Sequence, residues 1–129
     1  MATVLIVDDE KGIRDLLRKV LEKLGYRVVT AADGNEGLAV FRLERPELVI
    51  TDIIMPNREG IEAITVMKRE NPGVKVLAIS GGGRAHAMDL LAVAPSAGAD
   101  ATLEKPFRAS DLLEWIERLM GAGSEGGGR

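Results

Sequence analysis

The 129-residue sequence contains no cysteine and only one histidine, His86. The absence of cysteine excludes disulfides, thiolate catalysis and cysteine-based metal sites, and it fits a reducing compartment. A single histidine cannot supply the two or three imidazoles of a histidine-rich metal site. Any bound cation would therefore need oxygen ligands.

An excess of positive charge is also missing, because seventeen basic residues face twenty acidic ones and the net charge is -3. The chain therefore lacks the broad positive field of a nucleic-acid binder, and we expect no direct nucleic-acid binding. No apolar run approaches the roughly 18 residues of a membrane span. The first residues include no basic segment of the kind that opens a signal peptide. These features predict a cytoplasmic protein without a membrane partner.

Apolar residues make up 46% of the chain, enough to bury one core in a chain of this length. Only the glycine-rich end, residues 121–129, resembles a flexible segment, because repeated glycine costs entropy to order and buries no side chain. We expect one domain over residues 1–120 and a flexible tail over 121–129. The tail could be a natural end or part of a linker to another domain.

Five short runs rich in β-branched and aliphatic residues recur along the chain. Each is continuously apolar or nearly so, which is typical of a strand covered on both faces. The predicted strands are residues 4–7, 28–30, 48–51, 76–79 and 101–103.

Segments with helical spacing separate these runs. The clearest helix has apolar residues at i, i+3, i+4 and i+7 and ends at Gly25. Its apolar positions are Ile13, Leu16, Leu17, Val20, Leu21 and Leu24; the other helices are marked by Leu38 and Phe41, by Ile61, Ile64 and Met67, by Met88, Leu91 and Ala92, and by Leu112, Ile116 and Leu119. Alternating strands and helices predict an α/β fold, a three-layer, doubly wound, five-stranded parallel sheet with right-handed crossovers. In such folds ligands bind at the carboxyl ends of the strands.

Charged and polar side chains follow four of the predicted strands. Asp8 and Asp9, with Glu10, follow the first strand, and Asp52 follows the third. Carboxylates in one cleft repel one another unless a cation compensates them, and carboxylate, carbonyl and water ligands match Mg²⁺. The alternative is that Asp8 and Asp9 only cap a helix or form a turn.

Asp52, Ser80 and Lys105 complete a set suited to phosphoryl transfer. A carboxylate beside a metal can accept a phosphoryl group as a mixed anhydride, which makes Asp52 the candidate nucleophile. Ser80, after the fourth strand, and Lys105, after the fifth, could bind phosphoryl oxygens. Each is unspecific alone: Asp52 could hydrogen-bond a turn, Ser80 could be an ordinary strand-end serine, and Lys105 could be a solvated surface residue.

These segments together resemble the receiver domains of bacterial two-component response regulators. The matching pieces are LIVDDE around Asp8 and Asp9, LVITDIIMP around Asp52, VLAIS ending at Ser80, GAD at residues 98–100, and LEKPF around Lys105. They cover about the first 120 residues. The resemblance implies a flavodoxin-like fold with strand order 2-1-3-4-5.

The resemblance also implies roles for individual residues. Asp52 would accept phosphate from a phosphohistidine on a sensor histidine kinase or phosphotransfer protein, and Lys105 and Ser80 would bind the phosphoryl group. Mg²⁺ would be held by Asp9, Asp52 and the backbone carbonyl of Ile54, with Asp8 acting mainly through water. The domain would be a phosphorylation-activated switch rather than a conventional enzyme, catalysing its own phosphorylation and dephosphorylation. It would act on an unknown downstream protein, and phosphorylation-dependent homodimerisation is a further expectation.

Three features depart from the family pattern. Thr102 stands three residues before Lys105, where the family usually has tyrosine or phenylalanine, so the usual aromatic readout is in doubt. The segment between Ser80 and Lys105 is longer than is typical, and we expect no output domain after Met120. Ile54 and Gly82 offer no side chain to orient water, which predicts hydrolysis that is not unusually fast.

Two alternative functions remain open. One is a receiver-like interaction module that binds a partner without phosphorylation, which Thr102 favours and the set of Asp52, Ser80 and Lys105 disfavours. The other is a small Mg²⁺-dependent phosphatase that forms an aspartyl-phosphate. Against it, the chain has no insertion large enough to enclose a substrate, and the candidate nucleophile does not follow the first strand with a D-x-D spacing.

Overall fold

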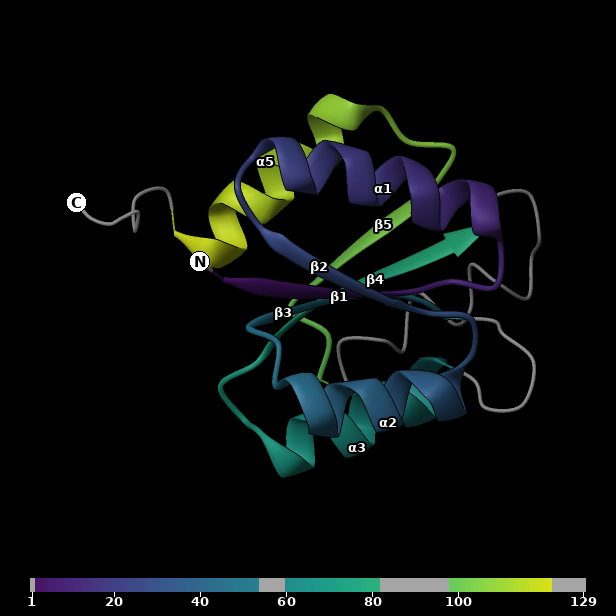
Figure 1. Cartoon of the computed structure of the whole chain (residues 1–129), viewed down its shortest axis with the longest axis vertical. Coiled ribbons are helices and arrows are strands. Elements are labelled where there is room, and N and C mark those ends of the chain that lie inside the picture. Colours follow the sequence, from purple (N-terminus) through teal and green to yellow (C-terminus); the bar gives the residue numbers. More distant parts are fainter. Residues whose placement is uncertain (1, 54–59, 82–97, 122–129) are drawn as a thin grey trace.

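A computed structural model of the chain describes residues 2–53, 60–81 and 98–121. A parallel sheet lies between two layers of helices (Figure 1). Its strands are β1 (Thr3–Val7), β2 (Arg27–Ala31), β3 (Leu48–Asp52), β4 (Lys75–Gly81) and β5 (Ala101–Lys105). The described helices are α1 (Lys11–Lys23), α2 (Gly34–Glu44), α3 (Gly60–Glu70) and α5 (Ala109–Met120).

The five strands pair in the order β2-β1-β3-β4-β5, and every pair is parallel. This confirms the predicted doubly wound α/β fold and its strand order. Val7 lies opposite both Ala31 and Thr51, so the carboxyl ends of β1, β2 and β3 meet at one edge of the sheet. The polar residues after β1 and at the end of β3 are thereby brought to the same edge.

The sheet divides the apolar core into two layers. Leu5 and Val7 of β1 pack in the layer beneath α2 and α3, and the intervening Val4 and Ile6 pack in the layer beneath α1 and α5. This alternation follows from the two-residue period of a strand. Because every residue of β1 is buried, neither face of the strand is exposed to solvent. The continuous apolar runs of the sequence arise in this way.

Helix α1 buries a narrower face than the apolar spacing predicts. Leu17 and Leu21 are fully buried, but Leu16 is 55% exposed and Leu24 is 53% exposed. Leu16 lies about 100° around the helix from Leu17, which turns it away from the sheet. Leu24 is the C-cap residue, and the chain turns at Gly25 with φ +94°, so Leu24 does not continue the apolar stripe.

The strands extend further than the apolar runs indicate. Asp52 is the last residue of β3 because the ladder continues to its partner Ile79, and Lys105 ends β5 opposite Gly81. Ser80 likewise lies within β4 rather than after it. The predicted helix at Met88, Leu91 and Ala92 lies outside the described residues. Among the described residues, no helix combines the length and the apolar content needed to span a membrane.

Candidate functional site

The loop between β1 and α1 positions two of the candidate acidic residues. The backbone N–H of Asp8 donates to the carbonyl of Ala31 at 3.1 Å, which continues the pairing of β1 with β2. The Asp8 side chain is buried, whereas Asp9 is exposed. Glu10 is the N-cap residue of α1, but its side chain accepts no hydrogen bond from the helix backbone.

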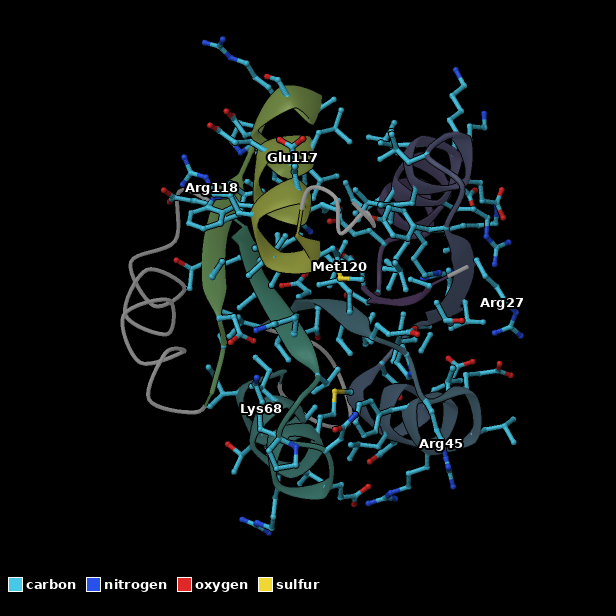
Figure 2. All side chains as sticks on the ribbon, turned by 90° about the vertical axis from the view of Figure 1, so that its left-hand side faces the viewer. Arg27, Arg45, Lys68, Glu117, Arg118 and Met120 are labelled. Carbon is cyan, nitrogen blue, oxygen red and sulfur yellow. The ribbon has the colours of Figure 1, made fainter. Side chains whose placement is uncertain are left out.

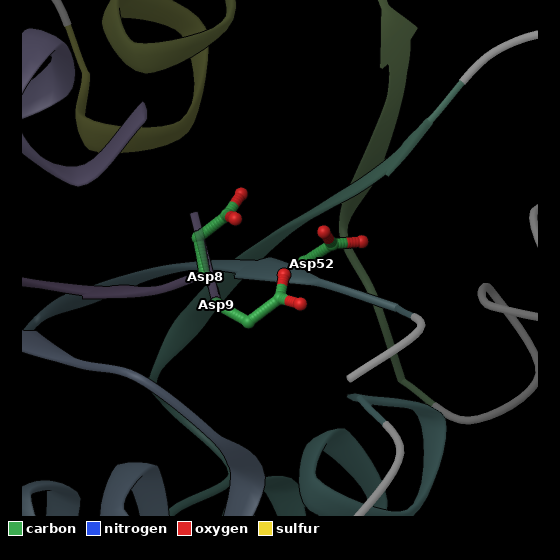
Figure 3. Close-up of side chains that lie close together, drawn as sticks. All are labelled: Asp8, Asp9 and Asp52. Atoms are coloured by element: carbon green, nitrogen blue, oxygen red, sulfur yellow. The ribbon is translucent and has the colours of Figure 1, made fainter. Parts of the chain in front are cut away.

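Three carboxylates lie together at the carboxyl ends of β1 and β3 (Figure 3). One oxygen from each of Asp8, Asp9 and Asp52 can be chosen so that all lie within 4.8 Å of one another. Such closely spaced negative charges repel one another, and a hard divalent cation relieves that repulsion. The structure therefore brings together the three acidic side chains singled out in the sequence, and their oxygen donors fit a cation such as Mg²⁺.

Lys105 reaches this cluster from the end of β5. Its Nζ donates to Asp8 Oδ2 at 2.9 Å, to Glu10 Oε1 at 3.0 Å and to Asp52 Oδ2 at 3.3 Å. Burial alone would lower the pKa of the ammonium, but the hydrogen bonds that it donates to Asp8 and Glu10 and the negative charge of Asp52 raise the pKa above its ordinary value. Lys105 is therefore a fixed positive charge, and its side chain is only 14% exposed.

The burial of Asp8 changes the pKa of its carboxyl group. Loss of solvation raises the pKa of this carboxyl above its ordinary value, although the backbone N–H of Glu10, at 2.9 Å from Oδ1, and Lys105 both oppose the rise. The carbonyl of Asp8 also accepts a hydrogen bond from Arg14 Nη1 at 2.7 Å. The loop is thus held from both sides, by Lys105 on the side chain and by Arg14 on the backbone.

Ser80 and Thr102 lie on the two strands beyond Asp52. Ser80 is buried within β4 and lies opposite Glu104, next to the Gly81–Lys105 pair. Thr102 is partly buried in β5 and lies opposite Ala78. Ile54, whose carbonyl the resemblance implies as a metal ligand, lies outside the described residues.

Sequence reasoning did not find every contact of this site. Glu10 was recognised as acidic but given no role, and Arg14 was overlooked. The sequence could have indicated the Arg14 contact, because Arg14 lies in the first turn of the helix that follows Asp8 and Asp9. The contact of Glu10 with Lys105 joins residues 95 positions apart in the chain, and the strand pattern alone does not indicate it.

Comparison with known protein families shows to which family the chain belongs. The pattern of the response regulator receiver domain family matches residues 4–117. The chain belongs to this family. The structure carries acidic side chains and a lysine at the strand ends where the receiver motifs place them.

Several receiver-containing proteins resemble the chain in sequence. It is 32% identical over 117 residues to sporulation initiation phosphotransferase F of Bacillus subtilis, covering 91% of this chain and 92% of that protein. It is 43% identical over 117 residues to the transcriptional regulatory protein PdtaR of Mycobacterium tuberculosis, covering 88% of this chain and 54% of that protein. The chain spans 47% and 49% of two other relatives, a ycf27 regulator of Cyanophora paradoxa and TcrX of Mycobacterium tuberculosis.

Solved receiver structures share the same fold. A receiver domain protein from Clostridium thermocellum superposes with a TM-score of 0.86 at 31% identity, covering 96% of this chain and 98% of that one. A CheY-like receiver domain protein from Methanospirillum hungatei gives a TM-score of 0.84 at 36% identity, covering 98% and 99%. These similarities agree with the observed strand order and show that the chain has a receiver fold.

Proposed function

We propose that this receiver domain is a switch controlled by phosphorylation of Asp52. The observation that carries the proposal is the placement of Asp52 beside two other carboxylates and within 3.3 Å of the ammonium of Lys105. This combination supplies a nucleophile, a cation site and a fixed positive charge at one sheet edge, which are the parts that phosphoryl transfer requires.

In the proposed reaction an Oδ atom of Asp52 forms a bond to the phosphorus of a phosphohistidine on a sensor kinase or phosphotransfer protein. The P–N bond breaks, and the leaving imidazole takes up one proton to become neutral histidine. Lys105 and Ser80 bind phosphoryl oxygens and offset their charge. In hydrolysis, water attacks the phosphorus, the P–O bond to Asp52 breaks, and phosphate and a carboxylate remain.

Asp9, Asp52 and the Ile54 carbonyl would hold Mg²⁺, with Asp8 acting through water. When bound, Mg²⁺ supplies positive charge to the carboxylates and to a phosphoryl oxygen. The buried Asp8 supports this role, because its contacts with Lys105 and the Glu10 N–H leave it fixed beside the cluster.

Phosphorylation would act on partner binding by drawing polar side chains toward Asp52. A phosphoryl group adds negative charge and three acceptor oxygens, which favours inward positions of Lys105 and Ser80.

We propose a domain over residues 1–120 with a flexible tail over 121–129, acting in the cytoplasm on a downstream protein partner. Phosphorylation-dependent homodimerisation remains part of the proposal.

Intact-mass spectrometry after incubation with acetyl phosphate tests the phosphorylation chemistry. We expect one added phosphoryl group that requires both Mg²⁺ and Asp52, so that Asp52→Asn remains unmodified. Asp15→Asn, at an exposed position on α1, is the matched control and should be modified like the wild type. An adduct that persists in Asp52→Asn, or none in the wild type with acetyl phosphate and with a phosphorylated histidine kinase, would refute the proposal.

Thr102 favours a second candidate, an interaction module that works without phosphorylation. Its side chain is smaller than the aromatic residue usual at this position and cannot make the same inward movement. If this alternative holds, partner binding is the same for the wild type and for Asp52→Asn. Under the main proposal, only the wild type changes its partner affinity after treatment with acetyl phosphate.

A further inference from the structure

The ammonium of Lys105 has three N–H donors, and three carboxylates contact it. Asp8, Glu10 and Asp52 accept at 2.9, 3.0 and 3.3 Å, respectively. A phosphoryl oxygen that binds Lys105 must therefore replace one existing contact. Which carboxylate yields depends on how much each loses when it separates from the ammonium.

Burial separates the three carboxylates clearly. The side chains of Asp8 and Asp52 are 2% and 9% exposed, whereas that of Glu10 is 63% exposed. Removing the partner of a buried charge is strongly destabilising, because water cannot replace the lost contact. An exposed carboxylate is rehydrated when its ion pair opens, so the pair contributes little free energy. Glu10 is the contact that opens at the lowest cost.

The local structure shows that the Glu10 side chain is not needed elsewhere. Glu10 is the N-cap residue of α1, yet its carboxylate makes no capping hydrogen bond. Its backbone is fixed separately, because its N–H donates to Asp8 Oδ1 and its carbonyl accepts from Ile13 and Arg14. The side chain can leave Lys105 without disturbing the loop or the start of the helix.

We propose that Glu10 is a positioning residue that occupies one donor of Lys105 until a phosphoryl oxygen displaces it. This inference rests on the proposed function of Asp52 and adds a competitor to it. Glu10 holds the ammonium near Asp52 and at the same time lowers the affinity of Lys105 for an incoming phosphoryl anion. The competition is weak enough to be overcome, since the pair lies at the surface.

Beryllium fluoride, a noncovalent analogue of the phosphoryl group, tests the competition by its affinity for the full chain at saturating Mg²⁺. We expect Glu10→Gln to bind it about two- to fivefold more tightly than the wild type, the factor that corresponds to an exposed ion pair. The second-order rate constant for phosphorylation by acetyl phosphate should rise by a similar factor. Both differences should shrink at high salt, which screens the wild-type pair.

Two further variants separate the contact from a general charge effect. Glu104→Gln removes the same charge from the neighbouring residue of β5, which is exposed and lies on the opposite face of the strand from Lys105, and should leave the affinity near the wild-type value. Glu10→Asp keeps the charge but shortens the side chain, and an aspartate at an N-cap favours capping the helix. It should therefore behave like Glu10→Gln.

The outcomes distinguish the two proposals. Unchanged or weaker binding in Glu10→Gln, or equal gains in Glu10→Gln and Glu104→Gln, overturns the role of Glu10 while leaving Asp52 phosphorylation intact. A wild type that neither binds beryllium fluoride nor gains a phosphoryl group overturns the proposed function and the role of Glu10 together. Urea denaturation of each variant verifies that all of them are folded in the assay.

Discussion

The first residue of α3 lies directly against the backbone of Asp52. A Cβ atom at Gly60 would be 2.1 Å from the Asp52 carbonyl oxygen and 2.8 Å from Cα of Ile53, whereas real Cβ contacts are essentially never below 3.0 Å. The Gly60 N–H also donates to the Ile53 carbonyl at 2.6 Å. Because both partners are backbone atoms, Gly60→Ala must move the start of α3 by about 1 Å from the end of β3.

The expected cost of Gly60→Ala follows from these contacts. Overpacking costs about 1–3 kcal/mol, and weakening the hydrogen bond costs about 1 kcal/mol more. The higher helix propensity of alanine relative to glycine offsets about 0.5–1 kcal/mol of this loss in stability. We therefore expect a loss of about 2 kcal/mol, which lowers the urea midpoint by about 1 M for a slope near 2 kcal/mol per molar urea. Fluorescence of Trp115, the only tryptophan, follows the unfolding.

Two other helical glycines are matched controls. A Cβ at Gly12 meets nothing within 4 Å, so Gly12→Ala should be neutral or stabilising. At Gly37 the nearest atoms are the two methyl groups of Val7, both at 3.1 Å, and a small adjustment of that side chain predicts an intermediate effect. Phosphorylation of Gly60→Ala by acetyl phosphate should also slow by about tenfold or more, because the start of α3 no longer packs in place against the backbone of Asp52. A Gly60→Ala protein within about 0.5 kcal/mol of the wild type would contradict this reasoning, since that is the range of unremarkable surface substitutions.

Three further predictions concern charge. Mg²⁺ at ten times its Kd should stabilise the wild type by about 1.4 kcal/mol, as measured in urea, and Asp9→Asn should reduce this gain. Lys68→Met should cost about 1 kcal/mol, because Lys68 in the last turn of α3 (Figure 2) pairs with the exposed Asp100 at 2.9 Å and also donates to the carbonyl of Val74; an unchanged urea midpoint would refute it. Hydrogen bonds from Arg42 lower the pKa of Glu70, so the pair stabilises above the ordinary glutamate value of 4.5 and its contribution is lost at lower pH. The difference in unfolding free energy between wild type and Glu70→Gln should thus be smaller at pH 3 than at pH 7.

The sequence predicts the fold well because burial on both faces removes polar alternation from the strands. The run that became β1 is apolar throughout, and each of its residues is buried. Exact strand ends were less predictable, because a polar residue can remain in the ladder when its partner is in register. Asp52 remains paired opposite Ile79 for this reason.

The sequence predicted which residues come together at the site, but not which of them contact one another. Parallel strands bring Asp8, Asp52 and Lys105 to one edge whatever their side-chain conformations, so their proximity follows from the fold. The partners of Lys105 depend on how far each side chain is buried and on the course of the loop after β1. Those properties are set by packing across the whole domain, which explains why the contact with Glu10 was not foreseen.

The two apolar layers meet different helices but share the same strands. In β3, Leu48 and Ile50 belong to the layer of α1 and α5, whereas Val49 belongs to the layer of α2 and α3. Asp52 ends this strand, and the next residue, Ile53, returns to the layer of α2 and α3. A displacement of Asp52 along its strand would therefore shift neighbours that pack in both layers of the core, Ile50 on one side of the sheet and Ile53 on the other.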